Sequence, residues 1–411
     1  MSRGPEKKTA IVVGGSVAGL FAGNILWRDG WSVKVCERAS GNLESRGAGI
    51  GTHDELFDAM RQAGAQVDEM IGIQVIGRAA YGPDGGEIAR FDYPQYLTSW
   101  GLLYRRLRAA LPKDIYHFER EVVEVSDGDD HATVTFADGV RENASLVIGA
   151  DGSWSTVRAL CNPAEAPRYC GYVAWRGLID ETEMSDAFRE RYARFLNFFM
   201  RNDQQLICYP VAGADDSVAP GRRRFSFLWY RSYDEESELP LLLTDANGTR
   251  HEHQISPTRI DSKCIALMQE EASRLLPPDF ADFLRRAPKP FLQPIYDLSP
   301  SHIVFRRIAL VGDAACVARP HVGAGVAKAA TDATTLAELL RNVPTVAEAL
   351  RGYERVRMPF GRALVERGRY LGAYLESPRS GATRARILPT EEIIRESAML
   401  LHSKNDLRSF E

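Results

Sequence analysis

Hydrophobic positions at the start of the chain follow a strand–helix–strand order. Residues 9–13 form a short apolar run rich in β-branched side chains, which predicts a strand. Leu20, Ile25 and Leu26 then recur at helical spacing, and residues 32–36 form a second apolar run. This order predicts a parallel β-α-β unit.

Alternating apolar and polar positions predict strands in the middle of the chain. Residues 74–91, with a turn at 83–86, and residues 121–140, with a turn at 137–139, each predict a hairpin. Many β-branched and aromatic side chains predict further strands at residues 172–179, 205–211 and 224–231.

Helical periodicity and breaker residues predict the other long segments. Residues 98–110 predict a helix, and residues 324–376 predict a long helix that a polar break at 377–383 ends. The remaining tail is amphipathic. Residues 215–222 and 243–253 carry Gly, Asp, Asn or Pro and predict loops.

Composition limits the kind of protein. A chain of 411 residues is long enough for two or three domains at roughly 100–200 residues each. With 45% hydrophobic and 26% charged residues, it has an ordinary globular composition, and a net charge of -4 predicts no nucleic-acid or membrane partner. Six scattered cysteines without metal-ligand spacing predict reduced thiols in a cytoplasmic protein without a metal site.

The first strand runs into a glycine-rich turn that has the spacing of a dinucleotide-binding motif. Gly14 permits the tight turn, and Gly19 lets the helix pack closely on the strand. Glu37 ends the second strand and can accept hydrogen bonds from ribose hydroxyls. Ser16 replaces the usual middle glycine; it is small and can donate to a phosphate. This motif alone does not separate FAD from NAD.

Two later strands end in similar turns. Residues 146–150 lead to Asp151-Gly152, with Ser155 and Arg158 soon after. Residues 310–311 lead to Gly312-Asp313, a turn that can put an aspartate on a ribityl hydroxyl and a helix N-terminus beside a flavin ring. Each aspartate can cap a helix and serve the cofactor at once. The three motifs together favour FAD, because a simple NAD dehydrogenase has no use for the third.

The motifs resemble those of the single-component flavoprotein monooxygenases, the para-hydroxybenzoate hydroxylase superfamily, and within it the 2,6-dihydroxypyridine 3-monooxygenase type. Further matching segments are residues 45–50, 98–100, 172–177, 209–211, 291–293 and 319–321. The resemblance implies an α/β fold. In it, a Rossmann-type FAD-binding domain is interleaved with a smaller α+β substrate domain on a mostly antiparallel sheet, and the C-terminus is helical.

The same resemblance divides the chain. The FAD-binding domain is assigned residues 8–73, 98–170 and 296–376, the substrate domain 74–97 and 171–295, and a C-terminal helical tail 377–411. The tail is expected to pack on the body or to support a homodimer.

The resemblance also implies a reaction. NADH or NADPH reduces FAD. The nicotinamide cofactor is expected to bind only transiently, because no second dinucleotide motif follows in the sequence. A flavin C4a-hydroperoxide formed with O2 then hydroxylates a small hydroxylated aromatic ring, such as a dihydroxypyridine. Two alternatives stay open: a larger phenolic or natural-product substrate on the same scaffold, and a flavin-binding protein without turnover.

The motifs and the resemblance assign cofactor contacts to residues near the three turns: Gly14, Ser16, Gly19, Glu37, Arg38, Arg46, Gly49, Arg105, Asp151, Arg158, Asp313, Pro320, Gly323, Ala324 and Gly325. Arg105 is assigned in place of a family arginine whose own position holds Tyr104. Cys316, Ala324 and Lys328 stand where many members have His, Gln and Asn.

Three residues are candidates for proton handling. His53, His321 and Tyr209 are the proposed catalytic residues, with helix capping, loop bracing and core packing as their ordinary alternatives. Trp229 and Tyr230 join Tyr209 as candidate substrate-pocket residues, although strand aromatics often belong to the core. Arg176 is the fourth candidate substrate-pocket residue. It would bind an anionic substrate or the nicotinamide phosphates, or form only a salt bridge.

Overall fold

Parallel strands at the N-terminal end of the chain build the first of three sheets. The computed structural model describes residues 8–44, 49–377 and 387–399. In spatial order the first sheet contains β16 (Val304–Phe305), β17 (Ile308–Leu310), β10 (Leu146–Gly149), β1 (Thr9–Val13), β2 (Ser32–Cys36) and β6 (Tyr116–His117). Only β16 runs antiparallel to its neighbour. The middle strands are almost wholly apolar and buried, as expected of a parallel sheet covered on both faces.

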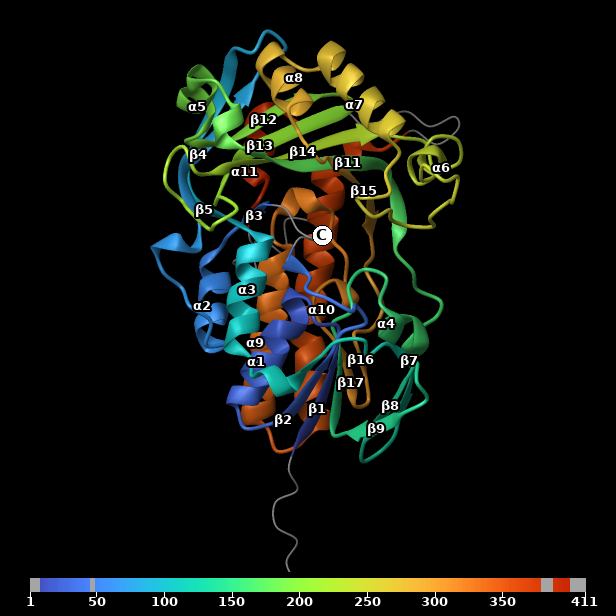
Figure 1. Ribbon diagram of the computed structural model, residues 1–411. Helices are drawn as coiled ribbons and strands as arrows, with labels where there is room; N and C mark the ends of the chain where they lie inside the picture. Colours follow the sequence, from blue (N-terminus) through green and yellow to red (C-terminus); the bar gives the residue numbers. More distant parts are fainter. Residues whose placement is uncertain (1–7, 45–48, 378–386, 400–411) are drawn as a thin grey trace, which may run out of the picture.

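Helices cover one side of this sheet, and a small sheet lies on the other side (Figure 1). The helices are α1 (Val17–Arg28), α2 (Asp54–Gln62), α3 (Trp100–Ala110), α9 (Gly325–Asn342) and α10 (Val346–Gly372). The small sheet contains β7 (Val122–Asp127), β8 (Ala132–Phe136) and β9 (Arg141–Ala144), and α4 (Thr156–Cys161) packs beside it.

A second large sheet lies at the opposite end of the molecule, and the long helix α10 runs between the two ends (Figure 1). Its order is β15 (Phe291–Asp297), β11 (Arg168–Asp180), β14 (Arg224–Ser232), β13 (Gln204–Val211), β12 (Phe195–Arg201), β4 (Ile73–Tyr81), β5 (Glu87–Ser99) and β3 (Gly49–Gly51). All neighbours are antiparallel except β12 and β4.

The two faces of the second sheet have separate cores. The outer face packs under α5 (Asp186–Tyr192), α7 (Ser262–Leu275) and α8 (Pro278–Arg285), with Trp175, Phe280 and Phe283 among its buried residues. The inner face carries Tyr172 and Tyr230, and α11 (Thr390–Glu396), with its buried Ile393, packs against β4 and β5. Short elements complete the structure: α6 (Leu239–Leu242) and 3-10 turns at Glu69–Ile71, Lys113–Ile115, Glu181–Glu183, Gly312–Ala314, Pro320–Val322 and Ala373–Leu375.

The predicted α/β fold class is confirmed, but several element boundaries were wrong. The predicted helix 324–376 is two helices, because residues 343–345 interrupt it and Thr345 caps α10 by accepting from the Glu348 N–H. The predicted helix at 98 begins at Trp100, since Ser99 is its N-cap and still pairs with β3. The 121–140 hairpin gains a third strand, β9.

The division of the chain into domains stays a prediction. Strand β3, which the sequence assigned to the FAD-binding part, is an edge strand of the second large sheet. Among the described residues, no helix combines the length and the apolar character that crossing a bilayer requires.

Candidate functional site

The three strand-ending motifs meet at one edge of the first sheet. Strands β1, β10 and β17 are parallel neighbours, so their carboxyl ends lie together, where α/β sheets bind ligands. The motifs are in direct contact. A Cβ on Gly14 would lie 2.5 Å from the Ala150 carbonyl oxygen, and one on Gly312 would lie 2.8 Å from the Ala18 Cβ.

The glycine loop has the geometry that a pyrophosphate site requires. Gly14 has φ +105°, which only glycine adopts without strain, and a Cβ on Gly19 would lie 1.9 Å from the Gly14 carbonyl oxygen. Ser16 is the N-cap of α1 and makes no side-chain capping hydrogen bond. The first N–H groups of α1 are therefore available to phosphate oxygens.

Glu37 braces this loop. Its Oε2 accepts from the Gly15 N–H at 2.9 Å, and its Oε1 accepts from the Ala39 N–H at 2.9 Å. Each carboxylate oxygen has a further lone pair for a ribose hydroxyl. Arg38 is exposed beside it, and Arg46 lies outside the described residues.

Arg158 links the second and third motifs. Asp151 accepts from the Ser155 hydroxyl at 2.5 Å and from the Val157 N–H at 3.1 Å, so it holds the start of α4. The buried Arg158 guanidinium donates to the carbonyl oxygens of Ala314 at 3.0 Å and Asp313 at 3.3 Å. Arg158 therefore ties the two turns together.

Asp313 differs in exposure from the residues on either side of it. Its side chain is exposed whereas Gly312 and Ala314 are buried, and within the described chain no hydrogen bond to its carboxylate is found. Helix α9 follows and has no side-chain cap at Ala324, which leaves its first N–H groups, from the exposed Gly325 onward, for a ligand. Two uncapped helix N-termini and a solvent-facing aspartate at one sheet edge fit FAD.

The loop before α9 is held from three sides. Gly323 has φ +57°, and its carbonyl oxygen lies 3.3 Å from the His53 Nε2. Arg319, just before Pro320, donates to Asp297 at 2.8 Å and Glu376 at 2.6 Å.

The third side is the C-terminal segment. The Ala398 N–H donates to the His321 carbonyl oxygen at 3.0 Å.

His321 points into the second sheet. Its Nε2 lies 3.0 Å from the Tyr172 hydroxyl oxygen, and its ring centroid lies 4.5 Å from that of Tyr230. Burial, and next the Arg319 guanidinium, lower the pKa of His321 to about 3. The imidazole is therefore neutral at physiological pH.

Two further phenols and an arginine share this inner face. Tyr209 packs against Gly49, where a Cβ would lie 2.4 Å from a ring carbon. Burial raises the pKa of both Tyr209 and Tyr230, and the nearby Arg176 charge opposes the rise in each. Arg176 itself donates to Gln293 Oε1 at 2.7 Å. The structure thus places Tyr209 and Arg176 on the same face as Tyr230, the phenol that lies beside His321.

Trp229 does not belong to this group, and its prediction as a pocket residue was wrong. Adjacent strand residues point to opposite faces, so Trp229 lies in the outer core beneath α7 and α8. Its Nε1 donates to Gln204 Oε1 at 2.9 Å, which satisfies it there.

Arg105 and His53 have structural partners. Arg105 pairs with Asp216 and, at 3.6 Å, with Glu44, and so ties α3 to the loop after β13. His53 is buried at the N-cap of α2, without a capping hydrogen bond from its side chain. A cofactor role for Arg105 and a catalytic role for His53 stay predictions.

Sequence reasoning missed Tyr172 and the C-terminal segment. Tyr172 lies four residues before Arg176 on β11, so strand alternation already placed both on one face. Arg78, a buried residue of β4, donates to the carbonyl oxygens of Ile394 at 2.8 Å and Ala398 at 3.2 Å. This contact had no sequence signal, because the residues that it joins are far apart in the chain.

Comparisons with known proteins agree with this geometry. A family model described as FAD binding domain-like matches residues 169–297. The 2,6-dihydroxypyridine 3-monooxygenase of Paenarthrobacter nicotinovorans is 29% identical over 90% of this chain and 92% of its own. The structure of 2,6-dihydroxypyridine-3-hydroxylase from Arthrobacter nicotinovorans superposes with a TM-score of 0.86 at 27% identity, over 95% of this chain and 97% of that one. In sequence and structure the chain is similar to the flavin monooxygenases of the para-hydroxybenzoate hydroxylase superfamily.

A further relative of the chain is the 6-hydroxynicotinate 3-monooxygenase of Bordetella bronchiseptica, which is 26% identical over 85% of this chain and 87% of its own. The three strand-ending motifs lie at one edge of the first sheet, called here the cofactor edge, and an aromatic face lies on the second. His321 lies at the junction between them.

Proposed function

We propose that the protein hydroxylates a small N-heteroaromatic ring that already carries a hydroxyl group, such as a dihydroxypyridine, using NADH or NADPH and O2. Two relatives are named for hydroxylated pyridines, and one of them also has a closely similar structure. FAD supplies oxygen activation after reduction by NAD(P)H. The chain has to hold the ring, exclude water and take up the hydroxyl proton.

The observation that carries this proposal is the buried pair of His321 and Tyr172. The electron-rich ring is most reactive once its hydroxyl proton has begun to leave, so a proton acceptor must lie beside it. The neutral imidazole accepts or donates at the Tyr172 hydroxyl, 3.0 Å away. Because its pKa is about 3, His321 stays neutral, and its part in the transfer is to hydrogen-bond and orient the Tyr172 hydroxyl. Tyr209 and Tyr230 supply aromatic walls for the ring.

Close packing supports a small substrate over a larger one. A Cβ on Gly372 would lie 2.6 Å from the Tyr172 hydroxyl oxygen and 2.9 Å from the His321 ring. On the other side of the loop, a Cβ on Gly323 would lie 2.6 Å from Ala398. Glycine is needed at both positions because neighbouring groups already fill the space.

The other assignments are part of the same proposal. The residues at the glycine loop, the Asp151 turn and the Asp313 turn hold FAD, and Arg176 orients an anionic form of the ring. We also propose that NAD(P)H binds transiently and that the protein works in the cytoplasm as a homodimer; size-exclusion chromatography with light scattering tests the last point.

A substrate panel tests the function. Oxidation of NADH and NADPH by the FAD-loaded protein is followed with hydroxypyridines, simple phenols and larger phenolic compounds, and hydrogen peroxide is quantified in each assay. Fast oxidation with little peroxide for hydroxypyridines alone supports the proposal. The same result for larger phenols favours the second substrate class. Absence of stimulated oxidation with every compound favours a flavin-binding protein without turnover.

A further inference from the structure

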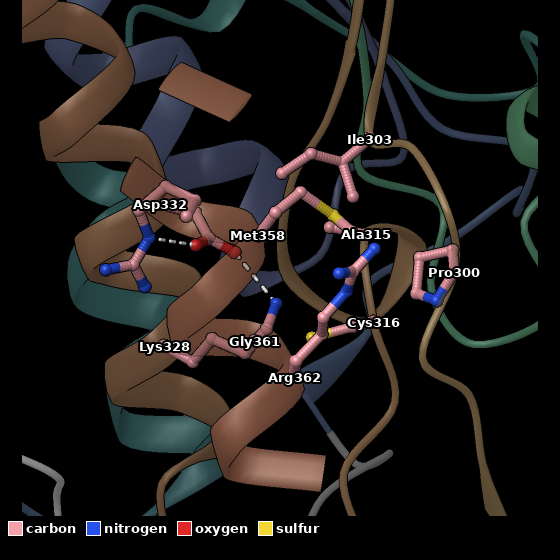
Figure 2. A pocket seen from close by; sticks show the side chains of 10 residues that line it. Pro300, Ile303, Ala315, Cys316, Lys328, Asp332, Met358, Gly361 and Arg362 are labelled. Carbon is pink, nitrogen blue, oxygen red and sulfur yellow. Dashed lines mark hydrogen bonds and ion pairs between the residues drawn. The ribbon is translucent and has the colours of Figure 1, made fainter. Parts of the chain in front are cut away.

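Two buried charged side chains of α9 form hydrogen bonds to the main chain of the Gly312–Asp313 turn. The Lys328 ammonium donates to the Gly312 carbonyl oxygen at 2.6 Å, and the Gly312 N–H donates to Asp332 Oδ2 at 2.9 Å. Lys328 and Asp332 are also paired with each other at 2.8 Å, one helical turn apart (Figure 2). Two side chains of one helix therefore fix both polar groups of a single residue.

A third charge completes the cluster. Arg357 of α10 donates from Nε to Asp332 Oδ1 at 2.7 Å and from Nη2 to Thr331 Oγ1 at 2.8 Å. The side chains of Lys328, Asp332 and Arg357 are only 3%, 2% and 8% exposed. Two buried cations share one carboxylate, an arrangement that contributes little to stability compared with apolar packing.

The turn that these charges hold has little freedom elsewhere. Gly312 has φ +62°, and a Cβ there would lie 2.8 Å from Ala18 of α1. From the opposite side, Arg158 donates to the carbonyl oxygen of Asp313. The orientation of the Gly312 peptide thus decides where the Asp313 carboxylate points.

The surroundings of Lys328 keep its ammonium charged. Lys328 borders a small cavity lined by Cys316, Met358 and Gly361, and Figure 2 shows its Nζ aimed from α9 toward Asp332. Burial is the largest influence and lowers the pKa of Lys328, but the charges and the hydrogen bond of its neighbours, Asp332 first among them, together outweigh burial. The net pKa is raised, so the side chain is charged. Burial also raises the pKa of Cys316, so that neighbour is an uncharged thiol.

We propose that Lys328 is a positioning residue for FAD: through the Gly312 carbonyl it fixes the turn that aims Asp313 at the cofactor. Replacing Lys328 by an apolar side chain removes this hydrogen bond but leaves Asp332 with the Gly312 N–H and with Arg357. The remaining cluster is a neutral ion pair, so the fold is retained. The inference rests on FAD binding and does not depend on the proposed substrate.

Lys328→Met and Lys328→Arg test the proposal. FAD is removed, the apoproteins are titrated with FAD by flavin fluorescence, and their thermal unfolding is recorded separately. We expect Lys328→Met to raise the Kd for FAD at least about tenfold while the melting temperature of the apoprotein stays near that of the unaltered chain. Lys328→Arg keeps a donor and a charge and should restore most of the affinity.

Glu181→Gln is the matched control. Glu181 lies in the 3-10 turn after β11, is 1% exposed, and pairs with Arg223, which precedes β14. The Glu181→Gln substitution should lower the melting temperature and leave the Kd for FAD unchanged. Equal FAD affinity in Lys328→Met and the unaltered chain would overturn the proposal. So would an equal loss in the control, or a Lys328→Met apoprotein that does not fold, because either would assign Lys328 a role in the fold.

Discussion

The cofactor edge and the aromatic face of this protein are built in different ways. At the cofactor edge, the main chain makes the site: glycine loops, helix N-termini and carbonyl groups lie at the ends of β1, β10 and β17. At the aromatic face, side chains from three strands, a loop and the C-terminal segment make it. The cofactor edge has no room for a Cβ at Gly14, Gly19 or Gly312, whereas the aromatic face depends on which face each side chain occupies.

The difference separates two kinds of failure. A change at the cofactor edge should remove FAD and with it every activity. A change at the aromatic face should leave FAD bound and alter the reaction alone. The variants below are ordered by the size of the effect we expect.

Gly14→Ala should have the largest effect. The added Cβ would lie 2.5 Å from the Ala150 carbonyl oxygen at a φ of +105°. We expect the Kd for FAD to rise by a factor of about 100 or more, roughly 2.7 kcal/mol. Gly30→Ala is the control, because Gly30 also has a positive φ, +85°, but has no atom within 4 Å of its added Cβ. Loss of FAD from both variants would mean that strain, and not the close approach, explains the result.

His321→Gln should leave FAD bound and slow the reaction. Loss of the proton acceptor is expected to lower kcat about 100-fold, in the usual range for general acid–base groups. Tyr172→Phe removes only the partner hydroxyl at 3.0 Å and should have a smaller effect of the same kind. Stopped-flow kinetics at several pH values separate this loss of kcat from a change in substrate KM. A His321→Gln protein with unchanged kcat would exclude His321 from proton transfer.

Acid pH should destabilise the protein through His321. The folded pKa of about 3 lies below the ordinary value of 6.5, so the unfolded chain binds more protons between these values. Stability is therefore full above pH 6.5 and is lost as the pH falls toward 3, by at most about 1.4 kcal/mol per pH unit from this residue. Urea unfolding of the unaltered chain and His321→Gln should show slopes that differ by this amount. Parallel curves would contradict a neutral buried imidazole.

Trp229→Phe and Tyr230→Phe should give the smallest and sharpest contrast. Trp229 lies in the outer core and loses one hydrogen bond to Gln204, so stability should fall by about 1 kcal/mol with kcat unchanged. Tyr230 lies on the inner face, 4.5 Å from the His321 ring, so its change should alter substrate KM or peroxide release. The reverse pattern would place the pocket on the other face.

The cofactor edge was largely predictable because its signals are local. A glycine where a Cβ would strike a carbonyl, and an aspartate just after a buried strand, are visible in a few consecutive residues, as at Gly14 and Asp151. The α/β fold class followed from the family resemblance that these motifs carry.

The aromatic face was only partly predictable. Tyr209, Tyr230 and His321 were named in advance, but Trp229 was placed beside them although it is adjacent to Tyr230 in a strand. The contacts of Arg78 and His321 with the C-terminal segment join residues hundreds of positions apart, and no local pattern encodes them.

The most direct measurement is the fate of molecular oxygen. The FAD-loaded protein is given NADH or NADPH, 2,6-dihydroxypyridine and ¹⁸O2, and the product is examined by mass spectrometry. The account predicts one ¹⁸O atom in the ring product for each NAD(P)H consumed. Consumption of NAD(P)H with all of the label in hydrogen peroxide and an unaltered ring would contradict it.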